Sequence, residues 1–258
     1  MHHKARRRFG QNFLSDESVL YNITQCLGLR EEDALIEIGP GKGALTGLIS
    51  SKLTQMWAIE IDRDLVPRLR QKYANVNVIE ADVLRFDFSK LFNLSERQWR
   101  IVGNLPYNIS TPLLDLLLVH ADRIKDMHFM LQKEVVQRLC AQPGSKSWGR
   151  LSIMMQYHCD VEKMLDVPPQ SFTPAPKVDS AFVRLTPKAK TLALKDKQVF
   201  KKVVRTAFNQ RRKTLRNALK VYLPVLSEVD IDLNVRPEQL SVSEYVHISN
   251  HVFMAENN

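Results

Sequence analysis

The feature that most constrains the fold of this sequence is an alternation of short apolar runs with helical patterns between residues 34 and 138. The first four apolar runs cover residues 34–38, 56–59, 76–79 and 100–102. Runs this short predict buried strands, and the longer segments between them have the 3.6-residue period of helices. The alternation predicts an α/β fold with a mostly parallel sheet and helices on both faces. Ligands of such sheets bind beyond the carboxyl ends of the strands, so the residues after each run are candidate site residues.

The residues that follow the first three runs have the chemistry of a nucleotide site. Residues 39–43, Gly-Pro-Gly-Lys-Gly, precede a helical pattern, and glycines there let the backbone approach a ligand closely. Glu60 lies 21 residues after Gly39, the offset at which an acid contacts a ribose diol in dinucleotide-binding units. Asp82 follows the third run and can accept a hydrogen bond from an adenine amino group. The glycine pattern also satisfies a loose dinucleotide fingerprint, so a nicotinamide enzyme stays an alternative at this point.

The fourth run ends in the tetrapeptide Asn104-Leu105-Pro106-Tyr107. An adenine amino group is a poor nucleophile because its lone pair is delocalised into the ring. The Asn104 carboxamide oxygen and the Leu105 carbonyl, fixed by the following proline, can together accept both amino hydrogens and free that lone pair. Tyr107 can stack on a base that has left its own stack. The tetrapeptide therefore indicates a site for an extruded adenine, with an ordinary Asn-x-Pro turn as the alternative.

A proline-restricted loop near residue 172 is a second candidate for base stacking. Residues 171–180 contain Pro174 and Pro176, which hold the backbone and would fix Phe172 as an exposed aromatic face. The alternative is a turn in which Phe172 packs into the core. The loop lies between two further predicted strands, residues 157–167 and 181–185, which we expect to form an antiparallel pair closing the sheet edge.

The net charge of +9 is concentrated in two short segments. Residues 10–187 are almost balanced, whereas residues 188–220 hold 12 lysines and arginines against the single acid Asp196. Residues 1–9 form a basic arm with four more. A surface of one sign suits a polyphosphate, so nucleic acid is the expected partner, with an acidic protein or a membrane surface as the alternative. We expect residues 1–187 to form the cofactor-binding domain and residues 188–258 a small, all-helical domain.

Several classes of protein do not fit this sequence. No stretch approaches the roughly 18 apolar residues of a membrane helix, and the first residues have no apolar segment of a signal peptide, so we expect a cytoplasmic protein. Cys26, Cys140 and Cys159 are odd in number and lack a C-x-x-C spacing, which favours reduced, buried thiols. The histidines and cysteines show no ligand spacing, so we expect no metal.

Taken together, six segments closely resemble the bacterial small-subunit rRNA adenine dimethyltransferases, the kasugamycin-susceptibility family. These segments are residues 11–14 (QNFL), 37–41 (EIGPG), 60–62 (EID), 104–107 (NLPY), 172–180 (FTPAPKVDS) and 211–217 (RRKTLRN). They occur in order over nearly the whole chain. The ordered set is highly specific, although no single member is.

The resemblance implies a class I methyltransferase with a Rossmann-like sheet. It would use S-adenosylmethionine to dimethylate two adjacent adenines in the 3′-terminal hairpin of 16S rRNA, late in small-subunit biogenesis. Its implied cofactor contacts are Asn12, Leu14, Gly39, Gly41, Glu60, Asp82 and Asn104. Its implied target site contains Asn104, Leu105, Tyr107 and Phe172. We expect RNA contacts at Arg211, Arg212, Lys213 and Arg216, and a monomer.

Two other functions share parts of this pattern. A resistance-type methyltransferase that acts on large-subunit rRNA has the same cofactor motifs, but the 211–217 run and the Phe172 loop favour the small-subunit enzyme. A non-catalytic ribosome assembly factor could keep the fold only to bind RNA. A pure binder has no use for Glu60 or Asp82, so the intact cofactor set favours an enzyme.

Overall fold

The computed structural model describes residues 11–189, 191–226 and 229–257, so the expected basic arm 1–9 lies outside the described residues. The chain divides into two compact units. The first contains residues up to 136 together with residues 162–187, and the second contains residues 137–161 together with residues 188 onward. The sequence predicted a single boundary after residue 187, whereas the chain passes between the units at three places.

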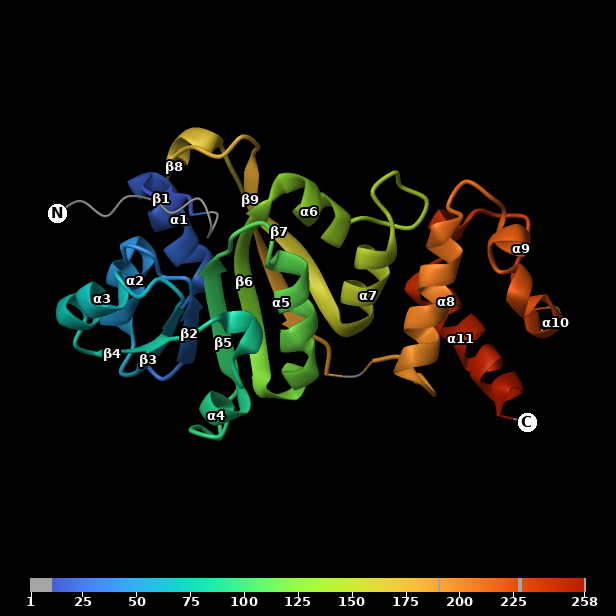
Figure 1. Ribbon diagram of the computed structural model, residues 1–258, viewed down its shortest axis with the longest axis horizontal. Helices are drawn as coiled ribbons and strands as arrows, with labels where there is room; N and C mark the ends of the chain where they lie inside the picture. Colours follow the sequence, from blue (N-terminus) through green and yellow to red (C-terminus); the bar gives the residue numbers. More distant parts are fainter. Residues whose placement is uncertain (1–10, 190, 227–228, 258) are drawn as a thin grey trace. The chain divides into compact units, whose positions relative to one another are not determined.

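A seven-stranded sheet forms the centre of the first unit (Figure 1). Its order is β4-β3-β2-β5-β6-β9-β7, and the first five strands run parallel. β9 pairs antiparallel with β6 and lies next to the edge strand β7. The strands are β2 (Ala34–Ile38), β3 (Met56–Glu60), β4 (Val76–Glu80), β5 (Trp99–Asn104), β6 (Ile124–Gln132), β7 (Cys159–Val167) and β9 (Ser180–Pro187). The predicted mostly parallel sheet is confirmed.

The strand order reverses direction at β2. The chain proceeds from β2 outward through β3 and β4, then returns to place β5 on the other side of β2. A reversal of this kind opens a crevice at the carboxyl ends of the two central strands. Gly103 lets these strands approach closely, because a Cβ there would lie 2.6 Å from the carbonyl oxygen of Ile38. The tips of β2 and β5 therefore meet beside the same crevice.

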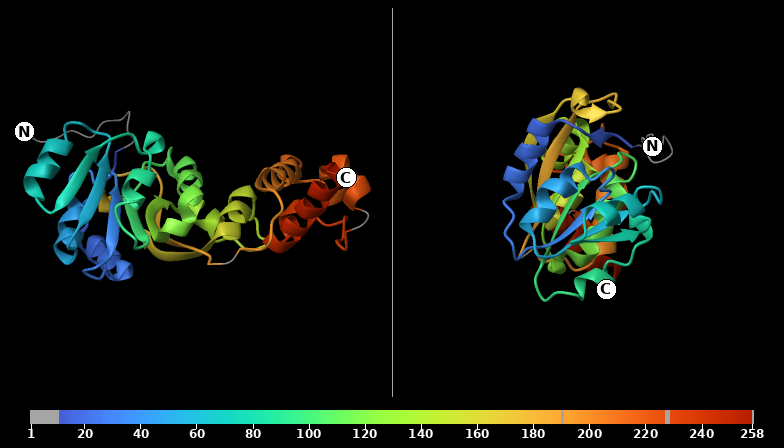
Figure 2. Two further views of the ribbon diagram at one scale, coloured as in Figure 1. Left: turned by 90° about the horizontal axis from the view of Figure 1, so that it is seen from below. Right: turned by 90° about the vertical axis from the view of Figure 1, so that its left-hand side faces the viewer.

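Helices cover both faces of this sheet, and Figure 2 shows α1 and α5 on opposite sides of it. Asp16 caps α1 by accepting from Ser18 N and Val19 N, and Gly28 ends the helix in a left-handed conformation. The buried face of α1 packs into one core cluster with β2, β3 and β4. The helices of this unit are α1 (Glu17–Leu27), α2 (Ala44–Ile49), α3 (Val66–Lys72), α4 (Ser89–Phe92), α5 (Ser110–Leu117) and the first residues of α6 (Lys133–Leu139).

A second, two-stranded sheet joins the start of the described chain to the proline-rich loop. β1 (Phe13–Leu14) pairs antiparallel with β8 (Phe172–Thr173), and Ser15 N donates to Ser171 O at 2.9 Å. Backbone hydrogen bonds within the first unit therefore hold the residues around position 13 in place.

The second unit is helical and has its own apolar core. Its helices are α7 (Arg150–His158), α8 (Lys197–Asn209), α9 (Leu215–Ala218), α10 (Leu223–Leu226) and α11 (Val242–Glu256). α7 was not predicted, and Tyr157 and His158 end this helix instead of beginning a strand. Trp148, Ile153 and Tyr157 pack in the core of this unit, which is why residues 137–161 belong to it.

Candidate functional site

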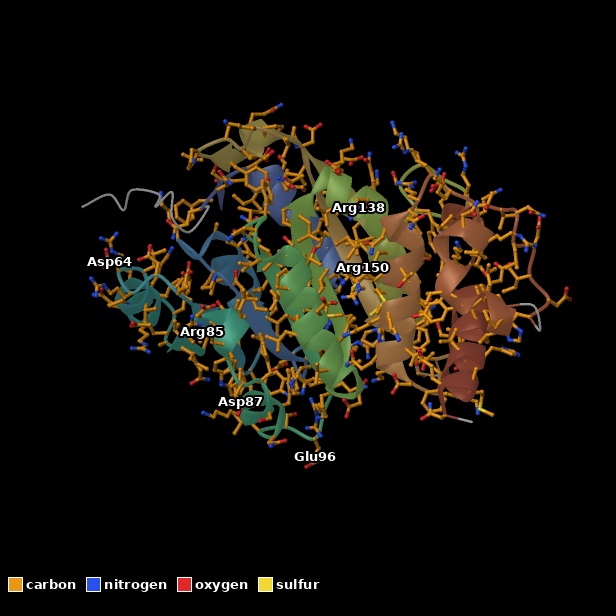
Figure 3. All side chains as sticks on the ribbon, turned by 45° about the vertical axis from the view of Figure 1, so that its right-hand side comes forward. Asp64, Arg85, Asp87, Glu96, Arg138 and Arg150 are labelled. Atoms are coloured by element: carbon orange, nitrogen blue, oxygen red, sulfur yellow. The ribbon has the colours of Figure 1, made fainter. Side chains whose placement is uncertain are left out.

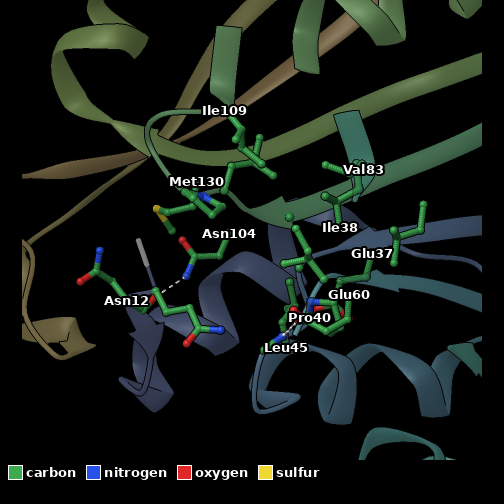
Figure 4. A pocket seen from close by; sticks show the side chains of 18 of the residues that line it. Asn12, Glu37, Ile38, Pro40, Leu45, Glu60, Val83, Asn104, Ile109 and Met130 are labelled. Carbon is green, nitrogen blue, oxygen red and sulfur yellow. Dashed lines mark hydrogen bonds between the residues drawn. The ribbon is translucent and has the colours of Figure 1, made fainter. Parts of the chain in front are cut away.

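A pocket of about 440 Å³ opens at the carboxyl ends of β2, β3 and β5 (Figure 4). This volume lies within the range of ordinary small-molecule sites. The pocket brings together nine of the residues predicted from the sequence, namely Asn12, Leu14, Gly39, Gly41, Glu60, Asp82, Asn104, Leu105 and Tyr107. Phe172 is the one predicted residue of the cofactor and target set that does not line it.

Glu60 is a buried acid of this pocket, with 3% of its surface exposed. One carboxylate oxygen accepts from Gly41 N at 2.9 Å, and the other accepts from Asp62 N at 2.8 Å. Burial raises the pKa of Glu60, while the amide donors of Asp62 and Gly41 oppose that shift. Each oxygen keeps a second lone pair, so the carboxylate is fixed in place and can still accept two hydroxyl groups.

The glycine loop, residues 39–43, packs against Phe13, which precedes α1. Gly41 has φ 59°, a left-handed conformation that favours glycine, and a Cβ there would lie 2.9 Å from the Phe13 ring. Lys42 Nζ lies 4.7 Å from the centroid of the same ring. Gln11 Nε2 donates to Asp62 Oδ2 at 3.0 Å. Residues 11–13 are thus held over one side of the pocket.

Asn104 is oriented by a residue 92 positions earlier in the chain. Its Nδ2 donates to the Asn12 carbonyl at 2.8 Å, the bond drawn in Figure 4. A carbonyl oxygen can only accept, so the amide atom that faces Asn12 has to be the nitrogen. The opposite atom of the amide, Oδ1, is therefore fixed as a hydrogen-bond acceptor. This is the orientation that a bound amino group requires.

The two predicted aromatic residues have different environments. Tyr107 lines the pocket, is half-buried, and shares a hydrogen bond of 2.8 Å with Ser180 Oγ. Phe172 is only 4% exposed and packs in the core with Leu14, its partner in the β1–β8 ladder. The structure thus corrects the prediction of an exposed stacking face and favours the alternative, a buried ring. Phe172 pairs with Leu14, which lines the pocket, so Phe172 supports the pocket wall without lining it.

Glu37 is a pocket residue that sequence reasoning did not single out. It lies inside β2, is 3% exposed, and accepts from Thr46 Oγ1 at 2.7 Å. Burial is the main cause that raises the pKa of Glu37 to about 7, and the nearby charge of Glu60 adds to the shift. An acid inside an otherwise apolar run was the available signal.

This raised pKa makes the stability of the protein depend on pH. Between pH 4.5 and about 7 the folded state holds a proton on Glu37 that the unfolded state has lost, so stability falls as pH rises. The full cost above pH 7 is about 3 kcal/mol. Glu37→Gln should therefore raise the melting temperature by about 5–10 °C at pH 8 and have little effect at pH 5.

Calorimetric scans at the two pH values measure this difference. Glu80→Gln is the matched control, since Glu80 is an exposed acid at the end of β4 in the same sheet and should shift neither scan. Equal melting temperatures for wild type and Glu37→Gln at pH 8 would contradict a buried, proton-binding Glu37.

The basic residues predicted to contact RNA do not have equivalent environments. Arg211 is bound within the second unit, where Nε pairs with Glu238 Oε2 at 2.6 Å and Nη2 donates to Lys146 O at 2.6 Å. Arg212, Lys213 and Arg216 are exposed. Arg211 therefore has a structural role that its place in the basic run did not reveal, and the other three present their charge to solvent.

Two further arginines of the second unit, Arg138 and Arg150, are exposed and labelled in Figure 3. Ser152 Oγ donates to the Arg138 carbonyl at 2.6 Å, which places the end of α6 beside the start of α7. No sequence pattern grouped these arginines with residues 211–216, because more than 60 positions separate them. They add positive charge to the second unit.

Metal-binding clusters and membrane-spanning helices are both absent from the described ranges. Within residues 11–189, 191–226 and 229–257, no group of three or more His, Cys, Asp or Glu residues is arranged to hold a metal ion. In the same part of the chain, no helix has the length and apolar character needed to cross a membrane.

Two known structures have the same architecture as this chain. A dimethyladenosine transferase from Plasmodium falciparum superposes with a TM-score of 0.78 at 25% identity, covering 92% of this chain and 95% of that one. The 23S rRNA methyltransferase ErmE superposes with a TM-score of 0.72 at 24% identity, covering 94% of this chain and 100% of that one. These similarities confirm the predicted class I methyltransferase fold.

Relatives found by sequence have about twice the identity of these two structures. Proteins named ribosomal RNA small subunit methyltransferase A are 52% identical over 257 residues in Pseudomonas aeruginosa and 50% identical over 262 residues in Psychromonas ingrahamii. The alignments cover 97% and 99% of this chain, and 95% and 97% of those proteins. The family model described as ribosomal RNA adenine dimethylase matches residues 2–253. The resemblance found in the motifs is confirmed, and the chain belongs to the ribosomal RNA adenine dimethylase family.

Proposed function

We propose that this protein uses S-adenosylmethionine to dimethylate N6 of two adjacent adenines in the 3′-terminal hairpin of 16S rRNA, late in small-subunit assembly. The observation that carries the proposal is one pocket in which Asn104, Leu105 and Tyr107 meet the buried carboxylate of Glu60. One side of this pocket suits the nucleoside part of a cofactor. The other side suits the amino group of a base.

The residues around Glu60 fit the proposed cofactor. When bound, S-adenosylmethionine supplies an electrophilic methyl group on a positively charged sulfur. The fixed carboxylate of Glu60 would accept hydrogen bonds from both ribose hydroxyls. Asp82 accepts from Leu84 N through one oxygen, and its second oxygen can accept from the adenine amino group of the cofactor. The glycine loop after β2 allows close approach of the backbone.

The residues at the tip of β5 fit the target base. Asn104 Oδ1 and the Leu105 carbonyl would accept the two amino hydrogens, which draws the lone pair out of the ring. Leu105 is 2% exposed and its N–H donates to Met130 O at 3.3 Å, so this backbone is held in place. Tyr107 would stack on the extruded base. Methyl transfer of this kind depends on positioning more than on a strong base, since the methyl group is already activated.

The choice between ribosomal subunits rests on sequence and not on fold. ErmE is named a 23S rRNA methyltransferase and superposes over nearly the whole chain, so the architecture alone does not select a subunit. Relatives named ribosomal RNA small subunit methyltransferase A are 50–52% identical over at least 96% of this chain. This identity supports the small subunit and disfavours the resistance-type alternative. A monomer acting in the cytoplasm, where the small subunit is assembled, fits the proposal.

We propose that exposed basic residues of the second unit contribute RNA affinity. Reversing charge at Arg212, Lys213 and Arg216 should weaken binding to small subunits and lower the salt slope by about one for each phosphate that is no longer neutralised. Arg211 is left unchanged because its ion pair with Glu238 would confound the result. Binding measured between 50 and 200 mM salt tests this expectation.

Charge reversal at Lys52 and Lys90, two exposed lysines of the first unit, is the control and should leave the salt slope nearly unchanged. Cofactor affinity should stay the same in both variants. A triple variant with the wild-type slope would place the RNA surface elsewhere, for example on the Lys4–Arg8 arm.

Transfer of a radiolabelled methyl group from S-adenosylmethionine tests the proposed substrate. Small subunits that lack the modification should be labelled, and large subunits incubated in parallel should not. Label in large subunits alone would support the resistance-type enzyme. Label in neither would support a non-catalytic RNA-binding protein.

A further inference from the structure

The hydroxyl of Tyr107 has a single buried partner. Tyr107 Oη and Ser180 Oγ lie 2.8 Å apart, although 73 residues separate them in the chain. Ser180 has no exposed surface, whereas Tyr107 is half-buried at the pocket wall. The hydrogen bond therefore connects a pocket residue to the interior of the sheet.

Ser180 is held at a fixed position by its strand. It is the first residue of β9 and pairs with Gln132, the last residue of β6. The preceding carbonyl, that of Asp179, accepts from Lys133 N at 2.9 Å. The backbone of Ser180 is thus anchored on both sides. Its side chain is fully buried, which restricts the positions that its hydroxyl can take.

Tyr107 has less local support. It lies in the turn between β5 and α5, where the Pro106 carbonyl accepts from Ile109 N at 3.1 Å. A tyrosine ring can turn about two side-chain bonds, and a hydrogen bond at its tip removes most of that freedom. Burial raises the pKa of Tyr107, and the hydrogen bond to Ser180, in which either hydroxyl can be the donor, opposes that shift.

We propose that Ser180 is a positioning residue for methyl transfer, which sets the plane of the Tyr107 ring on which the target base stacks. The inference rests on the proposed function. Its effect should be larger in the second transfer than in the first. After one methyl group is added, the target nitrogen has one hydrogen left, so the base is held by fewer hydrogen bonds and depends more on stacking.

A double-mutant cycle on methyl transfer tests this inference. Ser180→Ala and Tyr107→Phe each remove one hydroxyl of the pair, and the ring itself remains in both. Each should slow the second transfer about 3- to 10-fold, the range for one neutral hydrogen bond, and increase the fraction of monomethyladenosine. The double variant should be no slower than the slower single variant, because both changes break the same bond.

A control variant separates positioning from a general loss of stability. Ser249 is also buried, donates to Tyr245 O at 2.7 Å, and lies on α11 of the second unit. Ser249→Ala removes the same chemical group as Ser180→Ala and should leave the ratio of monomethyl to dimethyl product at the wild-type value. Cofactor affinity should be unchanged in all four variants.

The results that would overturn the role of the Tyr107–Ser180 pair differ from those that would overturn the proposed function. A wild-type enzyme that transfers no methyl group would overturn the function itself. An active wild type together with Tyr107→Phe at the wild-type product ratio would overturn only the role of the pair, even if Ser180→Ala failed to fold. Additive effects of the two substitutions would overturn it as well.

Discussion

Replacing Asn104 with alanine is expected to slow methyl transfer by about 10²–10³-fold, the cost of removing one preorganised polar contact from a reacting group. The carboxamide oxygen is fixed as an acceptor because Nδ2 donates to the Asn12 carbonyl. Alanine removes this acceptor and also the hydrogen bond to the Asn12 carbonyl. RNA docking should stay nearly intact, since it depends on phosphate contacts that are spread over many basic residues.

Conservative substitutions at Asn104 should separate the two transfers. After the first methylation one amino hydrogen remains, and the pocket must hold a methyl group where a hydrogen was. Asn104→Asp and Asn104→Ser should therefore accumulate monomethyladenosine, which mass spectrometry of digested rRNA detects. Asn77→Ala, an exposed asparagine on β4, is the control and should dimethylate at the wild-type rate. Dimethylation at that same rate by Asn104→Ala would remove Asn104 from the target site.

The second large effect is expected at Glu60. Glu60→Ala should weaken S-adenosylmethionine binding by about 1.5–3 kcal/mol, the range for hydrogen bonds to a charged group, which is roughly 10- to 150-fold in Kd. The structure adds a second cause, because Gly41 N and Asp62 N would lose their acceptor and the glycine loop its support. Calorimetric titration measures the affinity, and a melting curve checks that the variant is folded.

Glu80 provides a closely matched control for this experiment. It ends β4 directly beside Glu60 in the ladder, but it is exposed and lies outside the pocket. Glu80→Ala should bind the cofactor with wild-type affinity. Unchanged affinity in a folded Glu60→Ala variant would remove Glu60 from the cofactor site.

The residues at the strand tips could be predicted because their positions depend on local pattern and topology. Apolar runs determined where the strands end, and parallel strands place their carboxyl ends at one edge. Gly39, Glu60, Asp82 and Asn104 were therefore expected in one crevice, and they line one pocket.

The errors arose where local pattern does not determine burial. α7 is buried at Leu151, Ser152, Ile153, Met155 and Tyr157, which lie on more than one side of the helix, so the sequence shows no clear 3.6-residue stripe. Phe172 could have faced solvent or the core with equal local plausibility. Its pairing with Leu14, 158 residues earlier, places the Phe172 ring in the core.

Long-range polar contacts were also beyond prediction. The Asn12–Asn104 hydrogen bond and the Tyr107–Ser180 hydrogen bond join residues 92 and 73 positions apart. Arg100 begins an apolar run, yet it is buried and pairs with Asp126 at 2.8 Å. Arg100 and Asp126 meet through the register of β5 and β6, and the other two pairs depend on how loops fold over the sheet.

The most direct test of the proposed function is nucleoside mass spectrometry of 16S rRNA from unmodified small subunits, after incubation with wild-type protein and S-adenosylmethionine. The proposal predicts two N6,N6-dimethyladenosines per subunit, both in the 3′-terminal hairpin. The proposal would be contradicted if the adenines of that hairpin stayed unmodified after incubation with protein that is shown to bind S-adenosylmethionine.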